Sequence, residues 1–248
     1  MLRAVLVALA TFASASCGAA DLKILSGNGA RAAVTELAAR FDRATGHKTS
    51  VEFAVNPETR AKIEAGQPFD VAVLNPPVLD ALIKQKLVAA ETRTVLGRAG
   101  IGVGIRAGAP KPDISTVDAF KRTLLSAKAV AYPGEGASGK YFVSVVERLG
   151  LAEQMKPRMK PMPAEYNVEV VATGEADLVV VVASRISGVP GVQLVGGIPA
   201  ELQTWIGFTA GASPASRNPD PARALLRFFA TPDAAAVLKS TGIEPFVE

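Results

Sequence analysis

One local pattern recurs along this chain and limits what it can fold into: a short apolar strand, a small polar turn and an amphipathic helix. Residues 22–25, 51–55, 70–74 and 129–132 are the strands of four such units. Helices that alternate with strands in this way predict parallel β-sheets covered on both faces. In such sheets ligands bind beyond the carboxyl ends of the strands, where the polar turns lie. The expected fold class is therefore α/β, with doubly wound sheets.

The unit at residues 129–150 contains the most specific turn. Residues 134–140 (GEGASGK) fit the G-x-x-x-x-G-K pattern of a nucleotide-binding phosphate loop, but Tyr141 stands where Ser or Thr would hold magnesium. The turn still leads into a helix N-terminus, whose free N–H groups and positive dipole end favour an anion. We therefore expect Ser138 and Gly139 to belong to an anion site.

The N-terminus predicts export to the periplasm. Residues 1–20 have the order of a signal peptide: a positive residue, Arg3, then an apolar stretch at 4–13, then small residues before a cleavage site. Lipidation at Cys17 is the alternative, and it is disfavoured because Ser14 stands where a lipoprotein signal has a large aliphatic residue. A periplasmic protein meets no ATP, so nucleotide hydrolysis is excluded.

Composition excludes further function classes. The formal net charge of +4 is small and evenly spread, and aromatic residues make up 6% of the chain, which argues against a nucleic-acid partner. His47 is the only His, and the one Cys lies in the predicted signal peptide, so a His/Cys metal site is excluded and no cofactor is expected. A secreted hydrolase with a Ser138–Lys140 pair stays open, although no G-x-S-x-G motif is present.

The length and the glycine pattern predict two domains. Residues 99–104, which alternate between glycine and apolar residues, and the extended residues 201–206 are the expected hinge crossings. Residues 21–98 together with 207–248 would then form one domain, and residues 105–200 the other. A ligand cleft is expected between them.

Several polar turns are expected to line this cleft with short side chains and backbone N–H groups, which suit a compact, fully ionised anion. The candidate ligand contacts in these turns are Ser26, Asn28, Gly29, Asn56, Ser138 and Gly139. The candidate charge contacts are Arg31, Arg60 and Lys140, and weaker candidates are Tyr166, Asn167 and Arg185. The alternative is that Asn56-Pro57 and Asn75-Pro76 only start helices.

In their order and spacing, six segments resemble the molybdate-binding, ModA-like group of type II periplasmic solute-binding proteins. These segments are residues 53–66, 69–73, 124–132, 136–139, 147–150 and 199–203. The resemblance implies two α/β domains joined by crossing strands, an oxyanion held between them, no catalysis, and the membrane subunits of an ABC importer as partners. We expect a monomer.

The resemblance also assigns ligand contacts by position. They fall at Asn28, Gly29, Asn56, Ser138, Ala164 and Val182. The two hydroxyls and the Tyr that the family uses are replaced at these positions, which indicates a shifted ligand. Molybdate or tungstate is the first expectation, and a small carboxylate, phosphonate or sulfonate is the alternative. A periplasmic sensor or adaptor that binds the same ligand also stays open.

Overall fold

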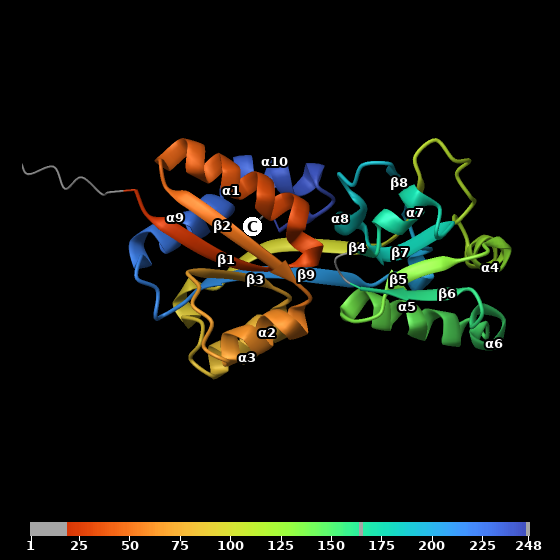
Figure 1. Ribbon diagram of the computed structural model, residues 1–248, viewed down its shortest axis with the longest axis horizontal. Helices are drawn as coiled ribbons and strands as arrows, with labels where there is room; N and C mark the ends of the chain where they lie inside the picture. Colours follow the sequence, from red (N-terminus) through yellow and green to blue (C-terminus); the bar gives the residue numbers. More distant parts are fainter. Residues whose placement is uncertain (1–18, 164–165, 247–248) are drawn as a thin grey trace, which may run out of the picture.

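Two lobes lie side by side along the long axis of the computed structural model, which describes residues 19–163 and 166–246 (Figure 1). The strands are β1 Asp21–Gly27, β2 Lys48–Ala54, β3 Val71–Leu74, β4 Thr94–Arg106, β5 Val130–Pro133, β6 Met159–Met162, β7 Leu178–Val182, β8 Val192–Gly197, β9 Trp205–Ala212 and β10 Glu244–Pro245. They follow the order β2-β1-β3-β9-β4-β7-β5-β6, and β8 and β10 also pair with β4.

Helices cover both faces of this curled sheet. The α-helices are α1 Arg31–Thr45, α2 Asn56–Glu64, α3 Pro76–Lys84, α4 Val117–Ser126, α5 Ala137–Arg148, α6 Ala152–Met155, α7 Glu169–Thr173, α8 Ala183–Ile186, α9 Pro219–Phe229 and α10 Pro232–Ser240. Short 3-10 helices are η1 Asn28–Ala30, η2 Ala90–Thr92 and η4 Ala200–Leu202.

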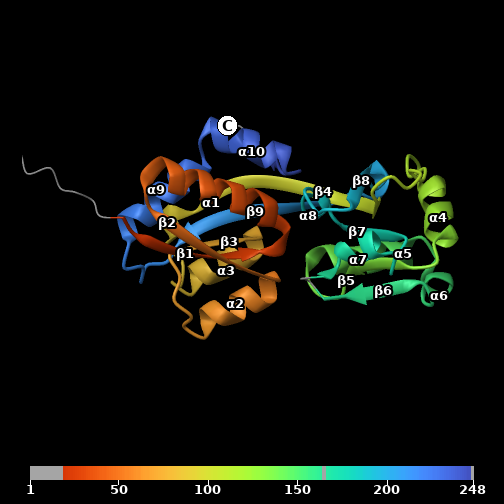
Figure 2. The ribbon, with the colours of Figure 1, turned by 45° about the horizontal axis from the view of Figure 1, so that its top comes forward.

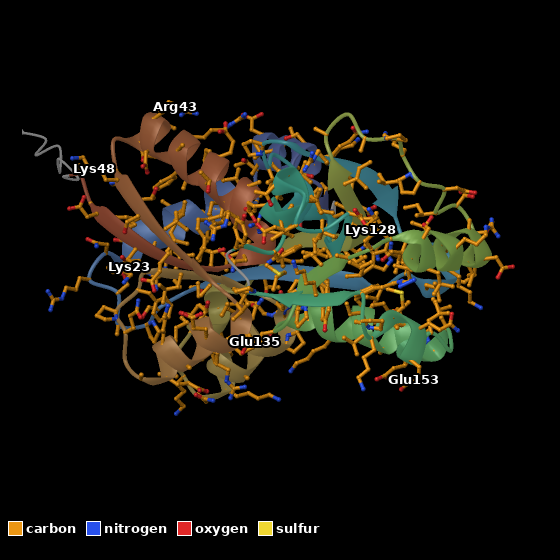
Figure 3. The ribbon with its side chains drawn as sticks, turned by 45° about the vertical axis from the view of Figure 1, so that its right-hand side comes forward. Lys23, Arg43, Lys48, Lys128, Glu135 and Glu153 are labelled. Carbon is orange, nitrogen blue, oxygen red and sulfur yellow. The ribbon has the colours of Figure 1, made fainter. Side chains whose placement is uncertain are left out.

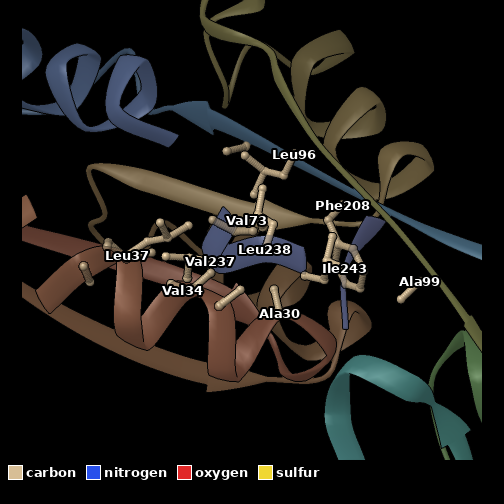
Figure 4. Packing of buried hydrophobic residues seen from close by; sticks show 14 of the residues in the cluster. Ala30, Val34, Leu37, Val73, Leu96, Ala99, Phe208, Val237, Leu238 and Ile243 are labelled. Carbon is tan, nitrogen blue, oxygen red and sulfur yellow. The ribbon is translucent and has the colours of Figure 1, made fainter. Parts of the chain in front are cut away.

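The first lobe is built on β1, β2 and β3, which pair in parallel as the sequence predicts. Helices α1, α9 and α10 cover one face of this sheet, and α2 and α3 cover the other (Figures 1 and 2). Figure 4 shows the buried side chains Val34, Leu37, Val237 and Leu238 packed between α1, α10 and the sheet. Each side chain of this kind contributes roughly 1.5–3 kcal/mol when it is fully buried.

The second lobe repeats the design with the parallel strands β5, β6 and β7. Apolar residues of α4, α5 and α6 form its main buried cluster, and α7 and α8 cover the opposite face. The fold class predicted from the sequence is therefore confirmed, with one addition. Strands β4 and β9 pair antiparallel with their neighbours, so the sheet is mixed.

Strand β4 connects the lobes. Its first part pairs with β9 in the first lobe, and residues from Ile101 onward pair with β7 and β8 in the second. Gln203 binds β4 at Ile101, where the strand changes from β9 to β7 and β8 as its partners. Its Oε1 accepts a hydrogen bond from the Ile101 N–H at 2.7 Å, and its Nε2 donates to the Ile101 carbonyl at 3.0 Å. The predicted crossing at 99–104 lies within β4, and the one at 201–206 spans the end of η4 and the start of β9.

Helix α4 is capped by Thr116, whose side chain accepts a hydrogen bond from the Ala119 N–H, and the neighbouring Ser115 donates to the Asp113 carboxylate. The short helix α7 and the strands β6 and β8 complete the second lobe.

Residues 1–18, which contain most of the predicted signal peptide and Cys17, lie outside the described residues. Among the residues that are described, no helix has both the length and the apolar character needed to cross a membrane.

Gly139 is needed for close packing between α5 and β5. A Cβ atom there would overlap the carbonyl oxygen of Pro133, and backbone cannot move aside as a side chain can. We expect Gly139→Ala to lower the free energy of unfolding by about 2–3 kcal/mol, the upper range for overpacking, as measured by urea denaturation. The control is Gly134→Ala in the same turn, where the new methyl group meets Pro161 and the Met162 backbone at ordinary contact distances. Equal stability of the two variants would contradict this role.

Candidate functional site

A small cavity of about 60 Å³ lies between the lobes, at the polar turns that follow the strands. The described residues that line it are Asn28, Gly29, Val55, Asn56, Asn75, Pro133, Glu135, Gly136, Ala137, Ser138, Asn167, Val181, Val182, Arg185, Ile206 and Phe208. They come from both lobes. The position agrees with the rule that ligands of open α/β sheets collect at the carboxyl ends of strands.

Asn28 presents a hydrogen-bond donor to this cavity. Its Oδ1 accepts a hydrogen bond of 2.6 Å from Nη2 of Arg31, so its amide nitrogen must point the other way. Nδ2 is buried and has no hydrogen-bond partner among the described residues, and the residue is 8% exposed. A buried donor that stays unsatisfied costs about 1–3 kcal/mol, which a ligand acceptor would recover. Arg31 itself stacks on the Phe53 ring, 4.3 Å from its centroid.

Asn56 and Asn75 form a second polar group, from the two helix starts of the first lobe. Asn56 Oδ1 accepts from the Asn75 N–H at 2.9 Å, and Asn56 Nδ2 donates to Asn75 Oδ1 at 3.3 Å. Neither side chain makes a capping hydrogen bond to its helix. These side chains therefore bind each other instead of capping, although α2 does begin at Asn56 and α3 directly after Asn75. Both residues also line the cavity.

The turn between β5 and α5 supplies the second lobe's contribution. Gly136 adopts φ +94°, a conformation that favours glycine, and it turns the chain into α5. The first residues of that twelve-residue helix, Ala137 and Ser138, line the cavity. Their position places the positive end of the helix dipole at the cavity. Glu135, an exposed residue of the same turn, also lines the cavity.

Arg185 places a buried positive charge in the wall. It lies on α8, directly after β7, and is 5% exposed. Its Nη2 forms an ion pair of 2.7 Å with Oε1 of Glu169 on α7. Burial by itself raises the pKa of Glu169, but the hydrogen bond from Arg185, backbone N–H groups and the Arg185 charge hold it below its ordinary value of 4.5. Glu169 is therefore ionised at neutral pH and orients the guanidinium.

Much of the remaining wall is apolar, although Asn167 also lines it. Val55, Val181, Val182, Ile206 and Phe208 face the cavity. Val182 occupies the position where the family resemblance places a Tyr. Donors on one side and apolar groups on another suit a ligand that has a hydrocarbon part as well as ionised ends.

The structure brings part of the predicted site together. Asn28, Gly29, Asn56, Ser138 and Val182 line the cavity. Of the weaker candidates, Asn167 and Arg185 also line it and Tyr166 does not. The other predicted residues that are described and lie outside its wall are Ser26, Gly139, Arg31, Arg60 and Lys140.

Those five residues are buried behind the wall, bonded to other residues or exposed to solvent. Ser26 is fully buried and its Oγ donates to the Gly27 carbonyl at 3.2 Å. Arg60 pairs with Glu64 on the exposed side of α2, and Lys140 is exposed. Ala164 lies outside the described residues.

The sequence analysis did not predict three lining residues as main ligand contacts: Arg185, Asn75 and Glu135. Arg185 follows a strand end, which is the signal that would have ranked it higher, and Asn75 was assigned to capping. Glu135 lies inside the glycine-rich turn, which the sequence predicted as an anion site with hydrogen-bond donors and no carboxylate. Among the described residues, no group of three or more His, Cys, Asp or Glu side chains lies close enough to hold a metal ion.

The Arg185–Glu169 pair predicts a pH-dependent contribution to stability. Because the pKa of Glu169 is lowered in the folded state, its contribution is present above pH 4.5 and is lost as the pH falls through the lowered value. Glu169→Gln should cost about 2 kcal/mol of unfolding free energy at pH 7, the range for a hydrogen bond to a charged group. Glu153→Gln, at an exposed position, is the control. Urea titrations at pH 7 and pH 3.5 measure the difference, and a cost that is unchanged at pH 3.5 would contradict it.

Comparison with known proteins identifies the family. The family described as bacterial extracellular solute-binding protein matches residues 22–244. The chain is 35% identical over 230 residues to a Pseudomonas sp. protein named aconitate isomerase, covering 90% of this chain and 87% of that protein. It is 27% identical over 235 residues to the molybdate-binding protein ModA of Azotobacter vinelandii, covering 90% of both.

The solved structure of the Azotobacter vinelandii periplasmic molybdate-binding protein superposes with a TM-score of 0.76, at 20% identity, over 90% of this chain and 98% of that one. At that identity the likeness concerns the fold alone. The resemblance to ModA-like type II solute-binding proteins is confirmed, whereas the oxyanion itself is not. By sequence and by fold, this chain belongs to the bacterial extracellular solute-binding proteins.

Proposed function

We propose that this protein captures a small organic polycarboxylate in the cavity between its lobes, in the periplasm. The observation that carries this proposal is Arg185, a buried guanidinium in a wall that otherwise offers mainly amide, hydroxyl and backbone donors. A guanidinium matches the two oxygens of a carboxylate with two parallel hydrogen bonds. Glu169 forms an ion pair with this guanidinium and holds it in place.

A polycarboxylate also accounts for the rest of the wall. One carboxylate would lie against Arg185, and a second would accept from Asn28, Asn75 and the start of α5. The carbon skeleton between them would contact Val182 and Phe208. The relative at 35% identity is named for aconitate, an unsaturated tricarboxylate, and we take aconitate as the lead ligand. Molybdate and tungstate are the competing ligands.

Capture would involve closure of the two domains. We propose that residues 21–98 with 207–248 and residues 105–200 move as two bodies about the crossings at 99–104 and 201–206, a hinge motion of the kind common in periplasmic binding proteins. A hydrogen bond of 2.7 Å from Ser184 Oγ to the Gly29 carbonyl joins the lobes beside the cavity. The closed monomer would then dock on the membrane subunits of an ABC importer.

A second candidate function is isomerisation of aconitate. It is favoured by the name of the relative at 35% identity and by the carboxylate of Glu135 in the cavity wall. The two functions share one binding step, so the same cavity would serve both.

Ligand binding is tested with a thermal-shift panel on the chain without residues 1–20. A ligand present at 100 times its Kd stabilises the folded state by about 2.7 kcal/mol, which raises Tm by roughly 5–10 °C for a chain of this size. We expect this rise with cis- or trans-aconitate or a close tricarboxylate. A rise with molybdate or tungstate alone would contradict the proposal.

Arg185 is tested by calorimetric titration of the tricarboxylate that gives the largest shift. Arg185→Gln should weaken its binding by about 100-fold or more, because removing one member of a buried charged pair costs about 2–5 kcal/mol. Arg185→Lys keeps the charge and should recover part of the affinity. The control is Arg98→Gln, at a partly exposed residue outside the cavity wall that stacks on Trp205. Equal affinities for Arg185→Gln and the control would rule out Arg185 as the charge contact.

The second candidate function is tested by incubating the protein with pure trans-aconitate and following cis-aconitate by proton NMR. We expect interconversion that reaches the same ratio of isomers from either starting compound, because an enzyme does not change an equilibrium. Binding without any interconversion would leave capture as the function and remove the isomerase.

A further inference from the structure

We propose that Glu135 is the residue that moves the proton in an isomerisation of the bound ligand. This inference rests on the second candidate function given above. Glu135 lies in the turn between β5 and α5, one residue before Gly136, and lines the cavity. Figure 3 shows it where the two lobes meet.

The carboxylate of Glu135 is available for chemistry. It makes no hydrogen bond or ion pair with any residue of the part of the chain that the structure describes. Two other described carboxylates are engaged: Glu169 is held by Arg185, and Glu58, which shares an outer surface hollow with Glu135, forms an ion pair of 2.6 Å with Lys62. Gly136, with its positive φ, holds the turn that presents Glu135 at the cavity.

A site that only binds an anion gains nothing from Glu135. The other polar side chains in the wall are dominated by donors, and a negative charge among them repels a polyanion and lowers its affinity. A carboxylate retained there needs another role, and proton transfer is the common role of an unpaired carboxylate beside a ligand.

The described lining residues offer no other group for this role. The Arg185 guanidinium has only donors and no acceptor atom, and the Asn and Ser side chains neither gain nor lose a proton near neutrality. The described part of the wall also has no thiol or imidazole. Temporary addition of a thiolate to the double bond is therefore not available from these residues.

The proton shift balances without a co-reactant. The Glu135 carboxylate takes a proton from the methylene carbon of aconitate, and the C–H electron pair forms a new C=C bond towards the central carbon. The old C=C electrons move outward, and their charge is delocalised onto the adjoining carboxylate. Donors such as Asn28 and the start of α5 would stabilise that charge. Glu135 then returns the proton to the carbon at the other end of the allyl unit.

The test compares the protein with Glu135→Gln in D₂O, with trans-aconitate as substrate. Proton NMR follows both the formation of cis-aconitate and the loss of the methylene proton signal through exchange with deuterium. We expect Glu135→Gln to reduce both rates by at least about 100-fold, the range for general acid–base catalysis. Its affinity for aconitate, from calorimetry, should be equal to or higher than that of the unmodified protein, which also shows that the variant is folded.

Glu58→Gln is the matched control, since it removes a carboxylate from the same outer hollow and should leave both rates unchanged. If Glu135→Gln keeps both rates, the assignment of Glu135 is overturned and the isomerase function stands. If the unmodified protein binds aconitate but neither converts nor exchanges it, Glu135 has no such role and capture alone remains. If it does not bind aconitate at all, the proposed function fails together with this assignment.

Discussion

The antiparallel pairing of β4 with β9 is the constraint on which the rest of the structure depends. Strand β4 has 13 residues, and it pairs with β9 and β10 in the first lobe and with β7 and β8 in the second. Each lobe can therefore present the carboxyl ends of its parallel strands to the other. Gln203 fixes the point at which β4 changes partners by bonding both backbone groups of Ile101. Without this pair the two sets of polar turns would not share a cavity.

The charges at the cavity are the reason for proposing a carboxylate as the ligand. Taking a guanidinium out of water costs several kcal/mol even after relaxation, and Glu169 offsets part of that cost for Arg185. Arg31 acts differently, since it lies outside the wall and fixes the orientation of the Asn28 amide. The protein thus places a cation and an oriented donor, Asn28 Nδ2, in one cavity wall, and the proposed polyanion would contact both. Glu135 is the exception among these groups, and its negative charge is understandable if it has a chemical role.

The sequence predicted the architecture well because the pattern of strand, turn and helix is local. It also led to Asn28, Asn56 and Ser138, since strand ends are visible in a sequence. It did not mark Arg185 as a strong candidate for a ligand contact, because the position of this side chain depends on an ion pair with a residue 16 positions earlier and on the short helix α8. Asn75 shows the same limit: Asn-Pro starts a helix whether or not the side chain caps it. Here the long-range contact with Asn56, 19 residues away, decides the matter.

A crystal structure of the protein grown with aconitate tests the central claim most directly. Our account predicts a carboxylate in the cavity between the lobes, with oxygens about 3 Å from the guanidinium of Arg185 and from Nδ2 of Asn28. It also predicts the carbon chain against Val182 and Phe208. Aconitate bound at another place on the protein would contradict the account. The same holds for an inorganic oxyanion retained in the cavity in the presence of aconitate, with its oxygens held only by the turns and with no contact to Arg185.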